Sequence, residues 1–288
     1  MNLKDRLMKE GLIVVGAGTM GRGIAQFFLQ SAIPVTLIDL SKDILAQASE
    51  EIEKRLFRLE EKGKLPEGFT NQQLRQLTCS SSLTGHRGKL VIEAVVENME
   101  VKKKLFRQLA EAYDHSTIFA SNTSSLSISE MASTIPFPER LLGMHFFNPA
   151  PIMPLVEVIE GMETDGGIVE QVIQLLADLG KTPVRAIDTP GFIVNRVARP
   201  YYNEALKIYG EKVASFEQID RILRGAGFKM GPFELQDLIG IDINFATTCS
   251  LYEAFHQDPR FRPSPIQEQM VKSNRLGRKT GKGFYHYE

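Results

Sequence analysis

Short apolar runs alternate with helical patterns along the first two thirds of the chain. Residues 12–15 form one apolar run, a glycine-rich turn and a helical pattern follow, and residues 35–39 form the next run. Other runs with the length and composition of strands lie at 89–96, 117–120, 141–147, 155–159 and 183–187. Strands that alternate with helices are typical of a doubly wound α/β domain with a parallel sheet.

A different pattern begins after the turn sequence DTPG at residues 188–191, whose proline and glycine mark a linker. Ser215 and Gln218 have the spacing of a capping box. Helical patterns dominate this part of the chain, at 193–210, 216–224, 232–239, 243–256 and 265–274. We therefore predict an α/β domain at residues 1–187 and an all-helical domain at 188–288.

A helical pair interrupts the α/β pattern. A long charged helix is expected at residues 42–62, and turn residues follow at 65–68. Thr70 and Gln73 have capping-box spacing, which predicts the start of a second helix. The pair covers about residues 42–78 and is longer than a crossover between strands needs. We expect this insertion to have a function of its own.

Composition narrows the class of protein. The 288 residues are 43% hydrophobic and 24% charged, which is typical of a globular protein with a sizeable core. A formal net charge of −1 gives no sign of a nucleic-acid or membrane surface. No signal peptide or transmembrane run is evident, and Cys79 and Cys249 show no metal-ligand spacing. We expect a cytoplasmic protein with reduced thiols and no metal.

Residues 16–21, GAGTMG, fit the pattern GxGxxG between a strand and a helix. Gly16 permits the tight turn, Gly18 lets a pyrophosphate approach the backbone, and Gly21 lets the helix pack on the strand. Glycines in such a turn often serve the turn alone. The strand before it and the helix after it favour a dinucleotide site here.

Asp39 and the first helical turn complete this dinucleotide pattern. Thr19 and Met20 open the helix, whose unpaired N–H groups can bind phosphates. Asp39 ends the next strand, 18 residues after Gly21, where a carboxylate can accept from both ribose hydroxyls. A carboxylate there repels a 2′-phosphate and favours NAD over NADP, although Lys42 lies nearby. FAD and S-adenosylmethionine sites can share the same turn.

His145 is the one histidine of five that ends an apolar strand. Histidine side chains exchange protons near neutral pH and suit general acid–base catalysis, although a buried core histidine is the alternative. Glu157 shares a strand face with Leu155 and Ile159, where a carboxylate needs a partner unless an edge strand turns it to water. We expect Glu157 to bond one ring nitrogen of His145 and Glu160 to face solvent.

Two polar segments allow a structural or a functional interpretation. The run SNTSS at 121–125 follows a strand, where it can cap a helix or donate a hydroxyl to a substrate oxygen. It lacks GxSxG, so a nucleophilic serine is not expected. Arg55 and Lys62 lie two turns apart on one helix face, which is either solvated or directed at phosphates.

Seven sequence blocks occur in order: GAGTMGRGIA, AVVENMEVKKKLF, ASNTSSLSI, GMHFFNPAPIMPLVEVI, DTPGFIVNR, GPFELQDLIGID and GRKTGKGFYHY. On these blocks the chain resembles the short-chain L-3-hydroxyacyl-CoA dehydrogenases, including 3-hydroxybutyryl-CoA dehydrogenases, over nearly its whole length. The resemblance implies a Rossmann-type domain that binds NAD and a helical second domain that forms a homodimer.

The resemblance also implies roles for single residues. His145 matches the catalytic base and Glu157 its partner, while Ser124 and Asn195 match polar groups around the substrate oxygen. Contacts to the nicotinamide side or its ribose are implied for Glu97, Lys102, Asn148 and Lys279. Contacts to coenzyme A are implied for Arg55 and Lys62, with a serine at the position of Arg55 in the animal enzymes.

The expected reaction is NAD-dependent, reversible oxidation of a (3S)-3-hydroxyacyl-CoA to the 3-oxoacyl-CoA, as in the β-oxidation of fatty acids. An NAD-dependent dehydrogenase of a free hydroxy acid, such as a sugar acid, is an alternative, and so is a non-catalytic NAD-binding dimer. Residues 144–153 and 199–243 are expected to line the acyl pocket. The acyl tail can be aliphatic, polar or dicarboxylic, and its length stays open.

Overall fold

The computed structural model describes residues 2–287, which divide into two compact units with the boundary between Thr189 and Pro190. The first unit contains eight strands: β1 (Leu12–Val15), β2 (Val35–Ile38), β3 (Leu77–Ser80), β4 (Leu90–Glu93), β5 (Ile118–Ser121), β6 (Leu141–Phe146), β7 (Leu155–Glu160) and β8 (Thr182–Ile187). Its helices are α1 (Leu3–Glu10), α2 (Thr19–Gln30), α3 (Lys42–Glu61), α4 (Phe69–Leu74), α5 (Met99–Ala112), α6 (Ile128–Ala132), η1 (Pro138–Arg140) and α7 (Gly166–Asp178).

The eight strands form one sheet in the order β3-β2-β1-β4-β5-β6-β7-β8. All neighbours are parallel except β6 and β7, which run antiparallel. The first six positions have the order of a doubly wound dinucleotide-binding sheet, with its topological switch between β1 and β4. The expected α/β class is confirmed, and β3 is a strand that the sequence pattern did not predict.

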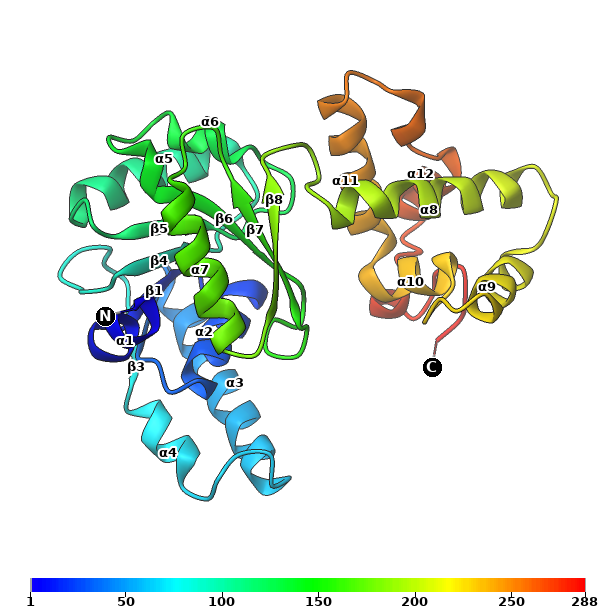
Figure 1. The fold of residues 1–288 in the computed structure, drawn as a ribbon. Coiled ribbons are helices and arrows are strands. Elements are labelled where there is room, and N and C mark those ends of the chain that lie inside the picture. The colour runs from blue at the N-terminus through cyan, green and yellow to red at the C-terminus, as the bar shows by residue number, and fades with distance from the viewer. Residues whose placement is uncertain (1, 288) are drawn as a thin grey trace. The chain divides into compact units, whose positions relative to one another are not determined.

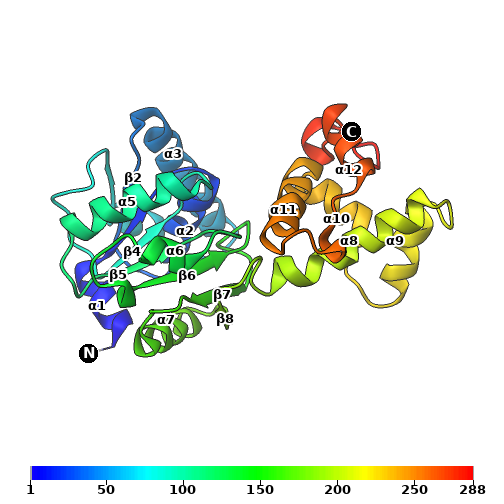
Figure 2. The same cartoon turned by 90° about the horizontal axis from the view of Figure 1, so that it is seen from above.

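Alternation along each strand separates the two faces of the sheet. Leu12 and Val14 of β1, with Met144 and Phe146 of β6, belong to one core with α1, α2 and α7. The other face packs on α5, where the rings of Phe106 and Phe119 lie 6.2 Å apart. Figure 2 shows α5 and α7 on opposite sides of the strands. Both faces are covered, as a parallel sheet requires.

The helices α3 and α4 extend away from the sheet (Figure 1). The predicted capping box at Thr70 is wrong, because α4 begins at Phe69 after Gly68, whose φ is +78°. The carboxylate of Glu60 accepts the N–H groups of Gly68 and Thr70 at 2.7 and 2.9 Å. The preceding helix therefore caps α4, and no local side chain is needed.

The second unit is helical, as expected. It contains α8 (Val194–Gly210), α9 (Phe216–Gly225), α10 (Pro232–Ile239), α11 (Ile241–Ala254), η2 (Pro259–Phe261), α12 (Pro265–Lys272) and η3 (Arg278–Thr280). The capping box of Ser215 and Gln218 is confirmed at the start of α9. Phe233 and Phe284 are central to its core, with ring centroids 4.7 Å apart.

Candidate active site

Polar side chains gather where the parallel strands of the first unit end. The glycine turn follows β1, Glu93 ends β4, Ser121 ends β5, and His145 precedes the last residue of β6. These strands run parallel, so their carboxyl ends lie at one edge of the sheet. Open α/β sheets bind ligands at this edge, next to the switch in strand order.

The glycine turn has the shape that a pyrophosphate requires. A Cβ on Gly16, whose φ is +101°, would lie 2.5 Å from the carbonyl oxygen of Ala94, and one on Gly21 would overlap the carbonyl of Gly16. Beside Gly18, no atom of the described residues lies within 4 Å of such a Cβ. Gly18 is the N-cap of α2 and has no side chain to cap the helix, so helix N–H groups remain for an anion. The turn therefore fits NAD.

Asp39 lies beside this turn, directly after β2. Its Oδ2 accepts from the backbone N–H of Ala17 at 2.8 Å, and its Oδ1 accepts from that of Ser41 at 3.0 Å. Each carboxylate oxygen can accept more than one bond, so both retain a lone pair. The two backbone bonds hold the carboxylate in place for the ribose hydroxyls that the sequence assigns to it.

His145 and Glu157 are paired across the antiparallel strands β6 and β7, directly opposite each other in the register. Nδ1 of His145 lies 2.7 Å from Oε2 of Glu157, and the two side chains are 8% and 1% exposed. A carboxylate accepts hydrogen bonds, so Nδ1 of His145 donates to Glu157. The pairing has the geometry of a base with an orienting acid.

The surroundings of β6 determine which way His145 points. Met144 and Phe146 face the core with α2, and Val156 and Val158 of β7 do the same. His145 and Glu157 therefore occupy the opposite face, since side chains alternate along a strand.

Asn122 anchors this end of β6, because its Oδ1 accepts the backbone N–H of Phe146 at 2.9 Å. The sequence pattern did not single out Asn122, because its role depends on a strand that lies 24 residues away.

A buried lysine of α5 joins two acids, one at the end of β4 and one in the loop that follows it. Nζ of Lys102 lies 2.6 Å from Oε1 of Glu93 and 3.2 Å from Oε2 of Glu97. Lys102 and Glu93 are 1% and 0% exposed, and Glu93 also accepts from Oγ of Ser121. Glu93 was not predicted from the sequence, because its role depends on Lys102 and Ser121, which lie on two other elements. The expected cofactor contact of Lys102 stays a prediction.

Glu97 connects this pair to the segment after β5. Its Oε1 accepts from the Thr123 hydroxyl at 2.7 Å and from the backbone N–H and hydroxyl of Ser124 at 2.8 and 3.1 Å. Burial raises the pKa of Glu97, but the Lys102 charge and the bonds from Thr123 and Ser124 outweigh it and lower the pKa. A negative Glu97 therefore orients Ser124, whose substrate contact stays a prediction.

Three other predicted residues lie outside this cluster. Asn148 is exposed after β6, in the turn that leads to β7. Asn195 lies in the first turn of α8 in the second unit. Lys279 is in η3 of the same unit, where its Nζ lies 2.6 Å from Oδ2 of Asp242.

Glu160, expected to face solvent, is only partly exposed because it pairs with Arg185 at 2.6 Å.

The two residues assigned to coenzyme A lie on α3. Arg55 is 44% exposed and pairs with Glu51 at 2.8 Å, and Glu51 also holds Arg22 at 2.9 Å. Lys62 is exposed and forms the C-cap of the helix. Basic side chains in this setting suit phosphates, and their contacts to coenzyme A stay a prediction.

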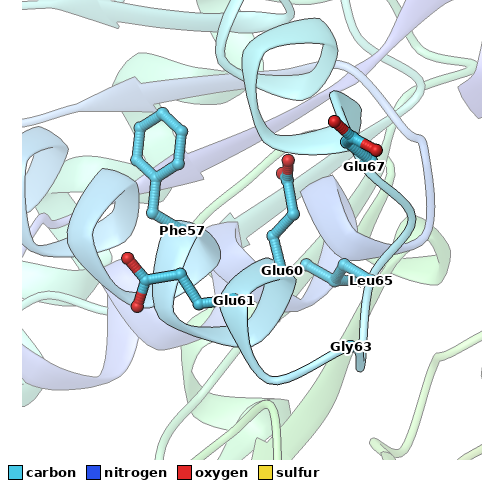
Figure 3. A pocket seen from close by; sticks show the side chains of 6 residues that line it. All are labelled: Phe57, Glu60, Glu61, Gly63, Leu65 and Glu67. Atoms are coloured by element: carbon cyan, nitrogen blue, oxygen red, sulfur yellow. The ribbon is translucent and has the colours of Figure 1, made fainter.

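A pocket of about 420 Å³ opens between the end of α3 and the turn that follows it, and Figure 3 shows the six residues that line it: Phe57, Glu60, Glu61, Gly63, Leu65 and Glu67. Hydrogen bonds from Thr70 and Gly68 lower the pKa of Glu60. Three carboxylates make this pocket unsuitable for phosphate groups. Any coenzyme A phosphate on α3 therefore belongs on the side of Arg55.

Within residues 2–287, no group of three or more histidine, cysteine or acidic side chains could hold a metal ion. None of the helices in that range is long and apolar enough to cross a membrane.

The family comparison covers almost the whole chain. The profile of the 3-hydroxyacyl-CoA dehydrogenase NAD binding domain matches residues 11–189, and that of the C-terminal domain of the same enzymes matches residues 191–287. The first profile agrees with the fit of the glycine turn to NAD.

Curated relatives carry the same activity in their names. The 3-hydroxyadipyl-CoA dehydrogenase of Escherichia coli K12 is 49% identical over 95% of this chain, but the chain spans only 58% of that protein. The mitochondrial hydroxyacyl-coenzyme A dehydrogenase of Sus scrofa is 40% identical, over 98% of this chain and 93% of its own length. The 3-hydroxybutyryl-CoA dehydrogenase of Clostridioides difficile is 41% identical, over 96% and 99%.

Solved structures show the same fold. A 3-hydroxybutyryl-CoA dehydrogenase from Escherichia coli K12 aligns with a TM-score of 0.92 and 48% identity, over 96% of this chain and 59% of its own. The (S)-3-hydroxybutyryl-CoA dehydrogenase PaaH1 of Ralstonia eutropha aligns at 0.91 and 39%, over 96% and 98%. With both domain profiles matched and these identities, the chain belongs to the 3-hydroxyacyl-CoA dehydrogenase family of NAD-dependent oxidoreductases.

Proposed function

We propose that this chain oxidises the C3 hydroxyl of a (3S)-3-hydroxyacyl-CoA to a ketone, with His145 as the general base. The observation that carries this proposal is the buried pair of His145 and Glu157, 2.7 Å apart at the ligand-binding edge of an NAD-binding sheet. A base at this edge is what alcohol oxidation needs beside a hydride acceptor.

The pair can perform the proton step by itself. Glu157 accepts from Nδ1 of His145, which leaves Nε2 as the atom that receives the hydroxyl proton. The resulting imidazolium is stabilised by the adjacent carboxylate, which is too deeply buried for water to screen it. In the reverse direction the same Nε2 returns the proton to the ketone oxygen.

In this proposal, residues beside the ends of β1 and β2 hold the cofactor. The turn of Gly16, Gly18 and Gly21 with the start of α2 takes the pyrophosphate, and Asp39 takes the adenosine ribose. Bound NAD supplies the acceptor for the hydride that leaves C3. Glu97 and Lys102 order the loop after β4 on the nicotinamide side.

Substrate contacts complete the proposal. Ser124, oriented by Glu97, and Asn195, in α8, donate to the substrate oxygen. Arg55 and Lys62 on α3 bind the phosphates of coenzyme A through exposed, salt-sensitive contacts.

We also propose that the second unit forms the homodimer interface. Its described surface includes large apolar side chains that are more than half exposed, namely Val197, Val213, Ile222, Phe228 and Ile243. Large exposed apolar side chains of this kind are often covered in an assembly.

The decisive experiment replaces the base. His145→Gln should lower kcat by about 10³-fold on 3-hydroxybutyryl-CoA with NAD, within the range for loss of a general base, while NAD binding is retained. NADH formation measures the rate, and His115→Gln is the matched control, since His115 is exposed beside Phe137.

A kcat for His145→Gln within a few-fold of the wild type would show that His145 is not the base. Free 3-hydroxybutyrate and sugar acids are tested in parallel. A higher kcat/KM on any of these free acids than on the CoA ester would replace the proposed substrate class.

A further inference from the structure

The second unit buries a cluster of uncharged polar side chains around one cation. The cation is Arg199 of α8, which is 3% exposed. The polar side chains come from α10, α11 and α12, and each is at most 1% exposed: Gln236, Asn244, Thr248 and Gln267. Buried arginines normally lie against carboxylates, so this composition needs an explanation.

One nitrogen of the guanidinium is fully engaged. Nη1 of Arg199 donates to the backbone oxygen of Asn244 at 2.8 Å and to Oγ1 of Thr248 at 3.1 Å, and Oδ1 of Asn244 lies 3.4 Å away. The guanidinium carbon also lies 4.9 Å from the ring centroid of Tyr202. Helix α11 and Tyr202 therefore hold the group in one orientation.

One edge of the guanidinium has no acceptor. Nε of Arg199 is buried without a hydrogen-bond partner, and Nη2 donates to none of the residues that the structure describes. These two nitrogens form one side of the planar fork, which matches the two oxygens of a carboxylate. Nδ2 of Asn244 is a second buried donor that lacks an acceptor.

Protein carboxylates do not neutralise Arg199. Among residues 2–287, no acidic side chain forms an ion pair with it. The two buried acids of this unit are engaged elsewhere: Asp220 accepts from Phe233, Glu234 and Tyr285, and Asp237 accepts from Phe284, Tyr285 and Tyr287. Burial lowers the pKa of the Arg199 guanidinium to about 10, so it is charged at neutral pH.

A buried charge without a counter-ion is costly, and the cost falls when an anion pairs with it. The position of Arg199 indicates which anion. It lies one helical turn after Asn195, on the same face of α8, because residues four apart are neighbours on a helix. Asn195 is the residue to which the proposed function assigns the substrate oxygen at C3. The acyl tail continues from that carbon.

We propose that Arg199 binds a terminal carboxylate on the acyl tail, through its Nε and Nη2, and that the preferred substrate is therefore a dicarboxylic 3-hydroxyacyl-CoA. This inference rests on the proposed function and names the substrate class of that site. It agrees with the name of the Escherichia coli relative, a 3-hydroxyadipyl-CoA dehydrogenase. Arg199 is then a specificity residue and takes no part in the proton step.

The first test compares two six-carbon substrates that differ only at the tail, 3-hydroxyadipyl-CoA and 3-hydroxyhexanoyl-CoA. The wild type should have a kcat/KM at least about tenfold higher for the adipyl ester, because a buried ion pair is lost with the hexanoyl ester. Equal values, or a preference for the hexanoyl ester, would overturn the inference even though both esters are oxidised. No turnover of either ester or of 3-hydroxybutyryl-CoA would instead overturn the proposed function.

The second test removes the charge with Arg199→Met, which has a similar length. The kcat/KM for 3-hydroxyadipyl-CoA should fall by about 50-fold, mostly through KM, while that for 3-hydroxyhexanoyl-CoA stays the same or rises. Arg196→Met is the matched control, because Arg196 is an exposed arginine on the same helix that stacks on Phe255. Its ratio between the two esters should equal that of the wild type.

An equal loss on both esters for Arg199→Met would mean that Arg199 has only a structural role, and the inference would be wrong. If this variant does not fold, Arg199→Lys keeps the charge but loses the planar fork. It should retain a reduced preference for the adipyl ester. A preference unchanged from the wild type in that variant would contradict the two-nitrogen contact, and the wild-type comparison decides the substrate class independently.

Discussion

In the first unit, the buried ionisable side chains of the candidate site lie against complementary partners, whereas Arg199 in the second unit lies against neutral oxygens. Glu157 lies 2.7 Å from His145, and Lys102 lies 2.6 Å from Glu93. Arg199 bonds only uncharged acceptors of α11. The paired groups are self-sufficient and can hold a catalytic geometry before any ligand binds. The unpaired group is suited to an ion that the ligand brings.

The largest effect is expected when the buried ion pair of Lys102 and Glu93 in the first unit is broken. Lys102→Met removes the cation and leaves Glu93, at 0% exposure, as a buried charge without a counter-ion. The free energy of unfolding should fall by about 3–5 kcal/mol, the usual cost of breaking a buried pair from one side. Urea unfolding followed by circular dichroism measures this change.

The double variant Glu93→Gln with Lys102→Met is the control for this loss. It removes both charges, so it should recover at least half of the lost free energy. A single Lys102→Met variant within about 1 kcal/mol of the wild type would show that Glu93 does not need its partner.

The next largest effect is expected at the pair of His145 and Glu157. Glu157→Gln keeps the size of the side chain and a hydrogen bond to Nδ1 of His145, but it removes the negative charge. The kcat should fall by about 100-fold, because the imidazolium loses its stabilising carboxylate. Steady-state NADH formation measures it, and a change of less than about threefold would assign Glu157 to packing alone.

The sequence predicts those parts of the site whose residues lie close together along the chain. The turn of Gly16, Gly18 and Gly21 is contiguous, so its fold and its ligand could both be predicted. The pair of His145 and Glu157 was also accessible, because two apolar runs joined by a short turn place them opposite each other. Such features follow from the period of a strand and the length of a turn.

Features that depend on contacts between distant elements were not accessible. Glu93 reads as the end of a strand, and its meaning needs Lys102 and Ser121 from two other elements. The cap of α4 was assigned to Thr70 because the carboxylate of Glu60 comes from another helix. Arg199 falls within residues 199–243, which the sequence assigns to the acyl pocket, but its burial against α11 could not be predicted. Periodicity identifies faces, but it does not identify which faces meet.

A smaller effect, on KM, is expected at the exposed charges of α3. They can be compared with the paired buried charges of the first unit and with the buried Arg199. Arg55→Ala with Lys62→Ala should raise KM for 3-hydroxybutyryl-CoA by about tenfold at low salt, with kcat nearly unchanged. The increase should shrink as sodium chloride is added. Lys54→Ala with Lys64→Ala is the matched control on neighbouring exposed lysines. Equal KM values for the two double variants would remove Arg55 and Lys62 from the coenzyme A site.

The smallest effect is expected for the free energy of unfolding of Arg199→Met. Its comparison with Lys102→Met tests whether the two buried cations differ in kind. Removing a buried charge that has no counter-ion relieves its desolvation cost, while the bonds from Nη1 to Asn244 and Thr248 are lost. These changes oppose each other, so the ligand-free variant should unfold within about 1 kcal/mol of the wild type, measured by the same urea titration as Lys102→Met. A loss as large as that of Lys102→Met would place Arg199 among the self-sufficient structural groups. Arg199 would then resemble the paired charges of the candidate site, and the distinction between paired and ligand-directed charge would not hold for it.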